Sequence, residues 1–201
     1  MHRNGEGAGR ALIVIDMINT YEHEDAELLV PSAERVVPVL ADLISRARSA
    51  DAPVIYANDN FGLWRSHHGE LVETALARPH ADLVAPIQPA DDSLFVVKAR
   101  HSIFYETPMA YLLWQLDVGG VVLCGQVTEQ CILYSALDAH IRHLEVTVSK
   151  DAVASIHPHL EAAALEMMER NMDARIVTAE EVDFRGSRWP VPDGGPHQPG
   201  G

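Results

Sequence analysis

Cysteine and long apolar runs are both scarce in this chain, and each scarcity excludes a class of protein. Two cysteines among 201 residues, Cys124 and Cys131, are too few for a disulfide framework and indicate a reduced, cytoplasmic setting. No apolar run reaches the roughly 20 residues that a membrane-spanning helix needs. Residues 1–10 lack the apolar core of a signal peptide, so neither export nor membrane insertion is expected.

Basic side chains are also few. The chain has 15 Lys and Arg residues against 29 Asp and Glu residues, which gives a formal net charge of -14 at pH 7. Nucleic acids and anionic membranes are polyanions, so this chain is not expected to bind either of them. The charge is compatible with a small-molecule partner that is neutral or cationic, although solubility alone would also account for it.

The residues that are present fit one α/β domain, because 47% of them are hydrophobic and can form a sizeable core. Apolar runs predict strands over residues 11–15, 53–57, 94–97, 118–124, 145–148 and 174–177. Helices are predicted over 32–50, 70–77, 107 to about 116, 128–143 and 159–172, with Ser32 as the first N-cap. This alternation predicts a three-layer αβα sandwich around a six-stranded, mostly parallel, Rossmann-like sheet.

The chain is expected to divide into three segments. A flexible N-terminus over residues 1–10 precedes one folded domain over residues 11–184. Residues 185–201 are rich in proline and glycine and show no periodicity. This tail is therefore expected to be disordered or to lie along a neighbouring subunit.

The stretch from Val121 to Cys131 carries the first candidate for chemistry. An apolar strand ends there at Gly125, and Cys131 falls at the start of the helix that follows. Unpaired backbone amides and the helix dipole favour a thiolate at such a position, and the thiolate is the form that attacks carbonyl carbon. The alternative is a small buried side chain that packs the helix against the sheet.

Two other predicted strands end in residues that could take part in the same chemistry. Asp16 follows the first strand, and Lys98 follows the third. The carboxyl ends of parallel strands lie along one edge of a sheet, so Asp16, Lys98 and Cys131 are expected to converge. Taken singly, a buried Asp or Lys would more often belong to a structural ion pair.

Three segments of the chain resemble the isochorismatase-like cysteine hydrolases, a family that includes nicotinamidases and N-carbamoylsarcosine amidase. Residues 13–19 (IVIDMIN) look like the family's opening strand with its Asp, and residues 97–104 (VKARHSIF) look like its Lys segment. Residues 125–131 (GQVTEQC) match the G-x-x-T-x-x-C signature. The segments occur in the family's order, and the resemblance spans about residues 11–178.

The resemblance implies a catalytic triad of Asp16, Lys98 and Cys131. In such a triad Asp16 would accept the thiol proton and return it to the leaving amine, while Lys98 would stabilise the charges of both partners. Cys131 would attack the carbonyl and form an acyl-enzyme that water hydrolyses. The resemblance also implies a cis peptide bond between Gln126 and Val127, with the amides of Val127 and Cys131 as the oxyanion hole.

Two departures from the family pattern bear on the substrate. Many members carry Gln two residues after the Asp, whereas this chain has Ile18. Nicotinamidases place a metal-binding Asp-x-His after the second strand, whereas residues 58–60 are Asn-Asp-Asn. His67 and His68 lie nearby, but an adjacent pair fits that arrangement poorly. Neither a metal nor another cofactor is expected, and nicotinamide is a poor candidate substrate.

The loop after the second predicted strand is expected to help select the substrate. Trp64 could stack on a planar or cationic group and Arg65 could bind a carboxylate, although aromatic side chains in loops often serve only as anchors. His101 closely follows Lys98 and could line the same cavity. The residues expected to form the pocket are Asn19, Tyr21, Asn60, Phe61, Trp64, Arg65, Phe104 and Thr128.

The sequence thus predicts a cysteine-dependent hydrolase of a C–N bond in a small molecule, within an amide, a lactam or a ureido group. Cys131 disfavours the vinyl ether cleavage of true isochorismatases, which lack the cysteine nucleophile. A non-catalytic member that binds a metabolite or serves assembly is the alternative of a different class, and a redox or acyl-transfer role is a third. Because the family commonly assembles, a homo-oligomer, dimer or tetramer, is expected, with the helix faces at 111–114 and 132–134 as candidate contacts.

Overall fold

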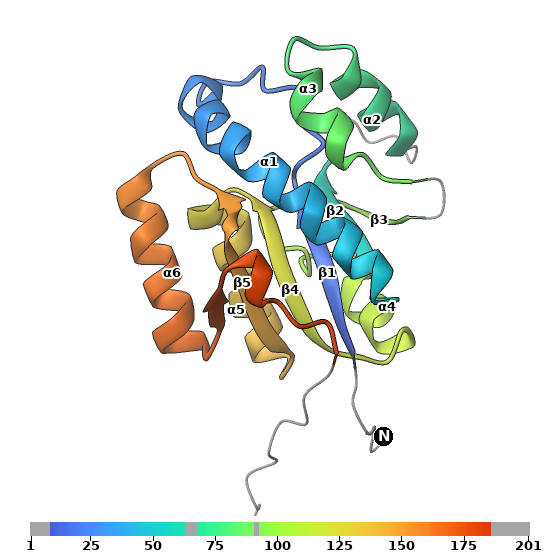
Figure 1. Cartoon of the computed structure of the whole chain (residues 1–201), viewed down its shortest axis with the longest axis vertical. Coiled ribbons are helices and arrows are strands. Elements are labelled where there is room, and N and C mark those ends of the chain that lie inside the picture. Colours follow the sequence, from blue (N-terminus) through green and yellow to red (C-terminus); the bar gives the residue numbers. More distant parts are fainter. Residues whose placement is uncertain (1–8, 63–67, 91–92, 186–201) are drawn as a thin grey trace, which may run out of the picture.

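The computed structural model describes residues 9–62, 68–90 and 93–185, and Figure 1 shows their arrangement. Residues 1–8 of the expected N-terminal segment and residues 186–201 of the expected tail lie outside this range. The described part forms helices around one sheet of six strands in the order β3-β2-β1-β4-β5-β6. No helix in the described part is long and apolar enough to cross a membrane.

Every strand lies where the sequence predicts one. The strands are β1 (Gly9–Ile15), β2 (Val54–Asp59), β3 (Leu94–Lys98), β4 (Val118–Gln126), β5 (Glu145–Ala154) and β6 (Arg175–Val177). All neighbouring pairs are parallel, so the predicted sheet is parallel throughout. Apolar and β-branched runs form these strands because helices cover both faces of a parallel sheet.

Helices cover both faces of the sheet (Figure 1). They are α1 (Ala26–Ser49), α2 (His68–Leu76), α3 (Ala81–Val84), α4 (Met109–Gln115), α5 (Leu133–Ile141) and α6 (Pro158–Met172), with 3₁₀ turns at Ala85–Ile87 and Ala179–Glu181 and a π-helical turn at Thr128–Ile132. Helices α1 and α3 pack with Leu12 and Val14 of β1 in one apolar cluster. Helices α4, α5 and α6 pack with Ala11 and Ile13 in another. Alternate residues of β1 therefore point to opposite layers, which confirms the predicted αβα sandwich.

No helix is predicted at the position of the short helix α3, and helix α1 begins earlier than the sequence predicts. The expectation that Ser32 caps it is wrong, because α1 begins at Ala26 and continues through Pro31. Ala26 and Leu29 are both buried, so the apolar face extends before Pro31, and its packing outweighs the backbone hydrogen bond that proline cannot make. The hydroxyl of Ser32 instead accepts a hydrogen bond from the backbone N–H of Ser155 at 3.1 Å.

Strand β5 is longer than predicted. It continues six residues beyond Val148, to Ala154. Lys150 and Asp151 are exposed and interrupt the apolar pattern, which is why the second half of the strand cannot be recognised from periodicity. The pairing with β4 shifts register at this position.

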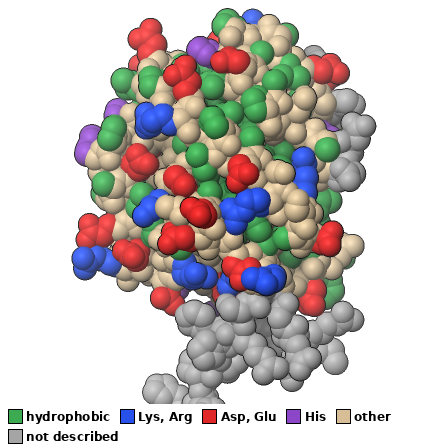
Figure 2. All heavy atoms as spheres, in the orientation of Figure 1, with side chains coloured by type: hydrophobic (Ala, Val, Ile, Leu, Met, Phe, Trp, Pro, Cys, Tyr) green, Lys and Arg blue, Asp and Glu red, His purple; other side chains and the backbone are tan. Residues whose placement is uncertain are grey.

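The face of the molecule that carries α1 mixes charges of both signs. In Figure 2, Asp and Glu side chains alternate with Lys and Arg side chains across this face, and no broad patch of one sign covers its described residues. The net charge of -14 is therefore not gathered into one acidic field here. An electrostatic attraction for a cationic substrate would have to come from another part of the molecule.

Candidate active site

The candidate residues lie where the strand order of the sheet reverses. β1 and β4 are neighbours, with β2 and β3 on one side and β5 and β6 on the other. In open parallel sheets, a crevice forms beyond the carboxyl ends of the strands at this position. Asp16 directly follows β1, Lys98 is the last residue of β3, and Cys131 lies in the π-helical turn after β4. Three segments that are distant in sequence therefore meet at one edge of the sheet.

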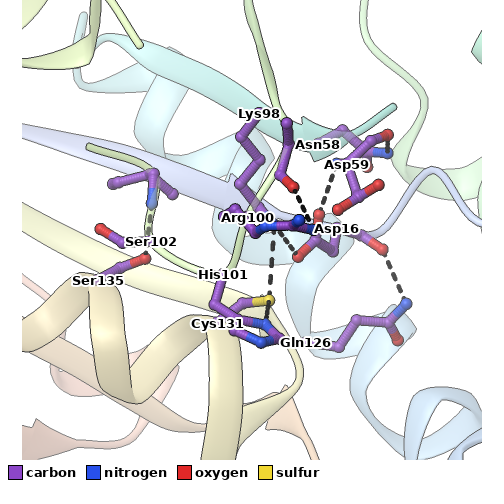
Figure 3. A network of polar contacts seen from close by, with 12 residues as sticks. Asp16, Asn58, Asp59, Lys98, Arg100, His101, Ser102, Gln126, Cys131 and Ser135 are labelled. Atoms are coloured by element: carbon purple, nitrogen blue, oxygen red, sulfur yellow. Dashed lines mark hydrogen bonds and ion pairs between the residues drawn. The ribbon is translucent and has the colours of Figure 1, made fainter. Parts of the chain in front are cut away.

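Asp16, Lys98 and Cys131 converge as expected, and Figure 3 shows their arrangement. Lys98 Nζ lies 2.7 Å from Asp16 Oδ2 and donates a hydrogen bond to Cys131 Sγ at 3.5 Å. The exposed fractions are 8% for Asp16, 1% for Lys98 and 8% for Cys131, so the three side chains are largely shielded from water. A carboxylate, an ammonium and a thiol in such contact can exchange a proton without help from solvent.

Asp16 is held in place by groups from neighbouring strands. The backbone N–H of Asp59, at the end of β2, donates to Asp16 Oδ1 at 2.7 Å. The side-chain amide of Gln126 donates to the Asp16 carbonyl oxygen at 2.8 Å, and the Tyr21 hydroxyl donates to Gln126 Oε1 at 3.3 Å. Both carboxylate oxygens of Asp16 thus have partners at the ends of β2 and β3, while Gln126 at the end of β4 holds the backbone of Asp16.

The turn that carries Cys131 depends on a close approach between β4 and β1. Gly125 has a φ of +109°, and a Cβ at this position would collide with the carbonyl oxygen of Ile15. The next peptide bond, Gln126–Val127, is cis. Residues Thr128–Ile132 then form a π-helical turn, a feature often found at functional sites. The predicted helix therefore opens with a π turn, and the roles of the Val127 and Cys131 amides stay a prediction.

Burial governs the protonation of the three residues. Burial raises the pKa of the Cys131 thiol to about 12; the charge of Asp16 adds to this rise, and Lys98 opposes it. Burial likewise raises the pKa of Asp16, against the attraction of Lys98. For Lys98, burial acts to lower the pKa, but the charges of Asp16 and Cys131 outweigh it and the pKa is raised. Burial therefore opposes the thiolate that the start of the helix is expected to favour, and the reactivity of the Cys131 thiol stays a prediction.

His101 also reaches the sulfur. Its Nδ1 lies 3.8 Å from Cys131 Sγ, and Figure 3 shows the sulfur between the Lys98 amine and the His101 ring. The ring of His101 contacts the ring of Tyr134 on α5, with centroids 5.4 Å apart. The sequence suggests His101 only because it lies close to Lys98 along the chain, and no motif indicates that it contacts Cys131.

Four of the expected pocket residues lie near the ends of β1 and β2. Asn19 Oδ1 accepts the backbone N–H of Tyr21 at 2.7 Å, and both residues are buried. Asn60 is buried, whereas Phe61, which follows it, is 47% exposed. The remaining two residues of this loop on which the substrate prediction depends, Trp64 and Arg65, lie outside the described residues.

The other two expected pocket residues make contacts within the protein. Phe104 belongs to the apolar cluster that includes Cys131, and the guanidinium of Arg142 lies 4.7 Å from the centre of its ring. Thr128 is fully buried, and its hydroxyl donates to the carbonyl oxygen of Ala154 at 3.0 Å. These contacts anchor the segments on either side of Cys131, and contact with a substrate stays a prediction.

The described residues do not build a metal site of the nicotinamidase kind. Asp59 Oδ1 accepts the backbone N–H of Phe61 at 2.7 Å, and the ring of His68 stacks on Phe95 with centroids 4.9 Å apart. Within residues 9–62, 68–90 and 93–185, no group of three or more His, Cys, Asp or Glu residues could hold an ion, and His67 lies outside these ranges. We therefore derive no reaction step through a metal.

Comparisons with known proteins agree with this architecture. The family model of the isochorismatase domain matches residues 10–181. The uncharacterized isochorismatase family protein YaaI of Bacillus subtilis is 35% identical over 175 residues, which cover 87% of this chain and 97% of that protein. Maleamate amidohydrolase of Pseudomonas putida is 28% identical over 167 residues, covering 78% of each chain. The crystal structure of N-carbamoylsarcosine amidase from Thermoplasma acidophilum is similar with a TM-score of 0.68 and 26% identity, covering 87% of this chain and 98% of that one.

Proposed function

The chain belongs to the isochorismatase family, and from this premise we propose that it is a cysteine hydrolase of a C–N bond in a small molecule. The bond lies in an amide, a lactam or a ureido group, and the reaction passes through an acyl-enzyme on Cys131. The observation that carries the proposal is the contact of Lys98 Nζ with both Asp16 Oδ2, at 2.7 Å, and Cys131 Sγ, at 3.5 Å. The names of two similar proteins, an amidohydrolase and an amidase, support C–N bond cleavage.

In the first half of the reaction, Asp16 accepts the proton of the Cys131 thiol while Sγ attacks the carbonyl carbon of the substrate. Lys98 contacts both groups and stabilises the charge that moves between them. The backbone amides of Val127 and Cys131 donate hydrogen bonds to the oxyanion of the tetrahedral intermediate. Asp16 then passes its proton to the nitrogen and the C–N bond breaks; an amine or ammonia departs from an amide or ureido compound, whereas the amine of a lactam stays attached to the acyl group.

In the second half, water attacks the carbonyl carbon of the thioester and the C–S bond breaks. A carboxylic acid leaves, the thiol recovers its proton, and one water is consumed for each C–N bond cleaved. Burial raises the pKa of Cys131 and so favours the protonated thiol in the resting site. Attack on the substrate is therefore coupled to proton transfer to Asp16, and the buried site never holds an uncompensated thiolate.

Substrate choice is proposed to depend on the residues around the carboxyl ends of β1 and β2. Asn19, Tyr21 and Asn60 lie there, and the exposed ring of Phe61 offers an apolar surface. Trp64 and Arg65 would complete this wall of the pocket. The net charge of -14 is compatible with a cationic substrate. The assay described next distinguishes amides, lactams and ureido compounds as substrates.

A panel of amides, lactams and ureido compounds, assayed for release of ammonia or amine, tests the proposal. We expect turnover by the wild type and a loss of roughly 10³-fold or more in Cys131→Ser, because the nucleophile acts as a unit with its proton acceptor. Cys124→Ser is the matched control: Cys124 is the other cysteine, its thiol faces the carbonyl oxygen of Ile13 inside the sheet, and the variant should stay active.

Two outcomes would contradict the proposal. Unchanged turnover in Cys131→Ser would remove this residue from the mechanism. Absence of turnover with every compound, together with absence of an acylated Cys131 by mass spectrometry, would favour a non-catalytic member of the family that binds a metabolite.

A further inference from the structure

His101 lies on the solvent side of the nucleophile. Its Nδ1 is 3.8 Å from Cys131 Sγ, and the residue is exposed, whereas Lys98, which contacts the same sulfur, is 1% exposed. Both carboxylate oxygens of Asp16 are already engaged, Oδ2 by Lys98 and Oδ1 by the backbone N–H of Asp59. Asp16, the base proposed for the first half of the reaction, is only 8% exposed, whereas His101 contacts the same sulfur and is open to water.

We propose that His101 is the general base for deacylation, the step in which water hydrolyses the acyl-enzyme. This inference rests on the proposed function and adds a catalytic residue to it. The water that attacks a thioester on Cys131 comes from solvent, and of the side chains that contact Lys98 or the sulfur, His101 is exposed whereas Asp16 and Lys98 are 8% and 1% exposed. An imidazole 3.8 Å from the sulfur can reach that water directly, and histidine is the side chain most often used for such a proton transfer.

The step balances with His101 as the base. With the ring proton on Nε2, Nδ1 takes one proton from water while the water oxygen forms a bond to the thioester carbon. The C–S bond then breaks with its electron pair on Sγ, and the imidazolium returns the proton to the sulfur. The carboxylic acid leaves with the second proton of the water, and Cys131 is a thiol again.

The segment that carries His101 is tied to the helix that continues from the nucleophile. The hydroxyl of Ser135, on α5, accepts the buried backbone N–H of Ile103 at 3.1 Å. The hydroxyl of Ser102 accepts the backbone N–H of Phe104 at 3.2 Å, and the ring of Tyr134 on α5 contacts the His101 ring. These contacts hold the imidazole near the sulfur, because α5 follows directly from the turn that contains Cys131.

Burst kinetics with p-nitrophenyl acetate test the proposal. Acetylation of Cys131 releases nitrophenolate in a burst, and deacetylation sets the steady rate. In His101→Gln we expect the burst rate to stay within about threefold of the wild type and the steady rate to fall roughly 10²-fold or more, so that acetylated Cys131 accumulates by mass spectrometry. His140→Gln, which removes an exposed imidazole from the last turn of α5, is the matched control and should behave as the wild type.

A second variant separates chemistry from structure. His101→Gly leaves space for added imidazole, which should restore part of the steady rate without changing the burst. Equal deacetylation rates in the wild type and His101→Gln would overturn the assignment, as would an equal slowing of burst and steady rate or a failure of imidazole to restore the rate. The proposed function fails differently: the wild type would then show no acetylation of Cys131, or Cys131→Ser would retain turnover.

Discussion

Gly125 sets the position of the turn that carries Cys131, because its backbone passes directly against the end of β1. Its φ of +109° lies outside the range that other residues readily adopt, and a Cβ would collide with the carbonyl oxygen of Ile15. Gly125→Ala should therefore lower the free energy of unfolding by about 3 kcal/mol or more, since backbone strain of ~1–3 kcal/mol adds to the collision. Urea denaturation measures this loss, and acylation of Cys131 should fall with it because the turn must shift.

Gly62→Ala is the matched control for this prediction. Gly62 also has a positive φ, +76°, but nothing lies within 4 Å of the position that a Cβ would occupy. The alanine should cost only about 1–2 kcal/mol, the price of the left-handed backbone alone. If the two alanine variants lost the same stability, the close approach of Gly125 to Ile15 would not be what requires the glycine.

Single residues of the site could be predicted only where a local pattern marks them. Asp16, Lys98 and Cys131 could be found because each follows or closes an apolar run, and parallel strands bring such ends together. His101 could not, because its contact with the sulfur depends on how the segment after β3 folds back onto α5, and that segment has no periodicity. The pKa of Cys131 could not be predicted either, since it depends on burial.

At the scale of elements, Glu129 joins the π-helical turn to the start of α6. Its Oε1 accepts the backbone N–H groups of Ile156 at 3.1 Å and His157 at 2.9 Å. His157 is the N-cap residue of α6 and Ile156 precedes it, so this carboxylate supplies an acceptor for two N–H groups where the chain enters the helix. Glu129→Ala should lower the free energy of unfolding by about 1–3 kcal/mol, because two donors lose their acceptor. Urea denaturation measures the loss, and the burst rate with p-nitrophenyl acetate should show whether the turn around Cys131 has loosened.

Glu129→Gln distinguishes the acceptor from the charge. The amide keeps an oxygen for the two N–H groups, and Oε2, which it replaces, is buried without a hydrogen-bond partner among the described residues. The glutamine variant should therefore lose less than about 1 kcal/mol. A loss as large as that of the alanine variant would mean that the charge, not the hydrogen bonding, joins the two elements.

The strands could be predicted in number and order, but no sequence pattern predicted the short helix α3, and the ends of the elements were predicted less well. Six apolar runs predicted six strands because a sheet covered on both faces requires such runs. The start of α1 is predicted too late because Ser32 has the side chain of an N-cap, whereas packing of Leu29 extends the helix through Pro31. The second half of β5 was missed because its exposed polar residues, Lys150 and Asp151, break the pattern while backbone pairing continues.

The molecule as a whole leaves aromatic rings exposed on two helices. Tyr111 and Trp114 of α4 are 64% and 69% exposed, and Tyr134 of α5 is 44% exposed. Leu113 and Ile132, from the same predicted faces, are buried in the core. On each face, some residues therefore pack in the core while the exposed aromatic rings are available for contact with another subunit. Assembly into a homo-oligomer stays a prediction.

Alkaline pH should weaken the whole fold because both of its thiols are buried. Burial raises the pKa of Cys131 to about 12 and also raises the pKa of Cys124. A thiol whose pKa is higher in the folded than in the unfolded state binds its proton more tightly when folded. The stabilisation of the fold by this buried thiol is thus fully present below about pH 8.5, the pKa of a cysteine in the unfolded chain. It is lost as the pH rises toward the pKa of the thiol in the folded protein. The free energy of unfolding should fall by up to about 1.4 kcal/mol per pH unit for each thiol above this pH.

Urea denaturation between pH 7.5 and 10, in steps of about half a unit, separates the two thiols from other groups. The pKa values of Tyr21, Tyr56 and Lys98 are also raised, but their unfolded values are about 10 or higher, so their effect begins near the end of this range. Cys131→Ala and Cys124→Ala should each remove about half of the fall in stability, and the double variant should remove nearly all of it. The comparison uses the slope of the free energy of unfolding against pH. The cavity that each alanine substitution creates lowers stability at every pH, so it does not change this slope. A double variant whose stability falls as steeply as that of the wild type would show that the buried thiols do not control the alkaline limit of the fold.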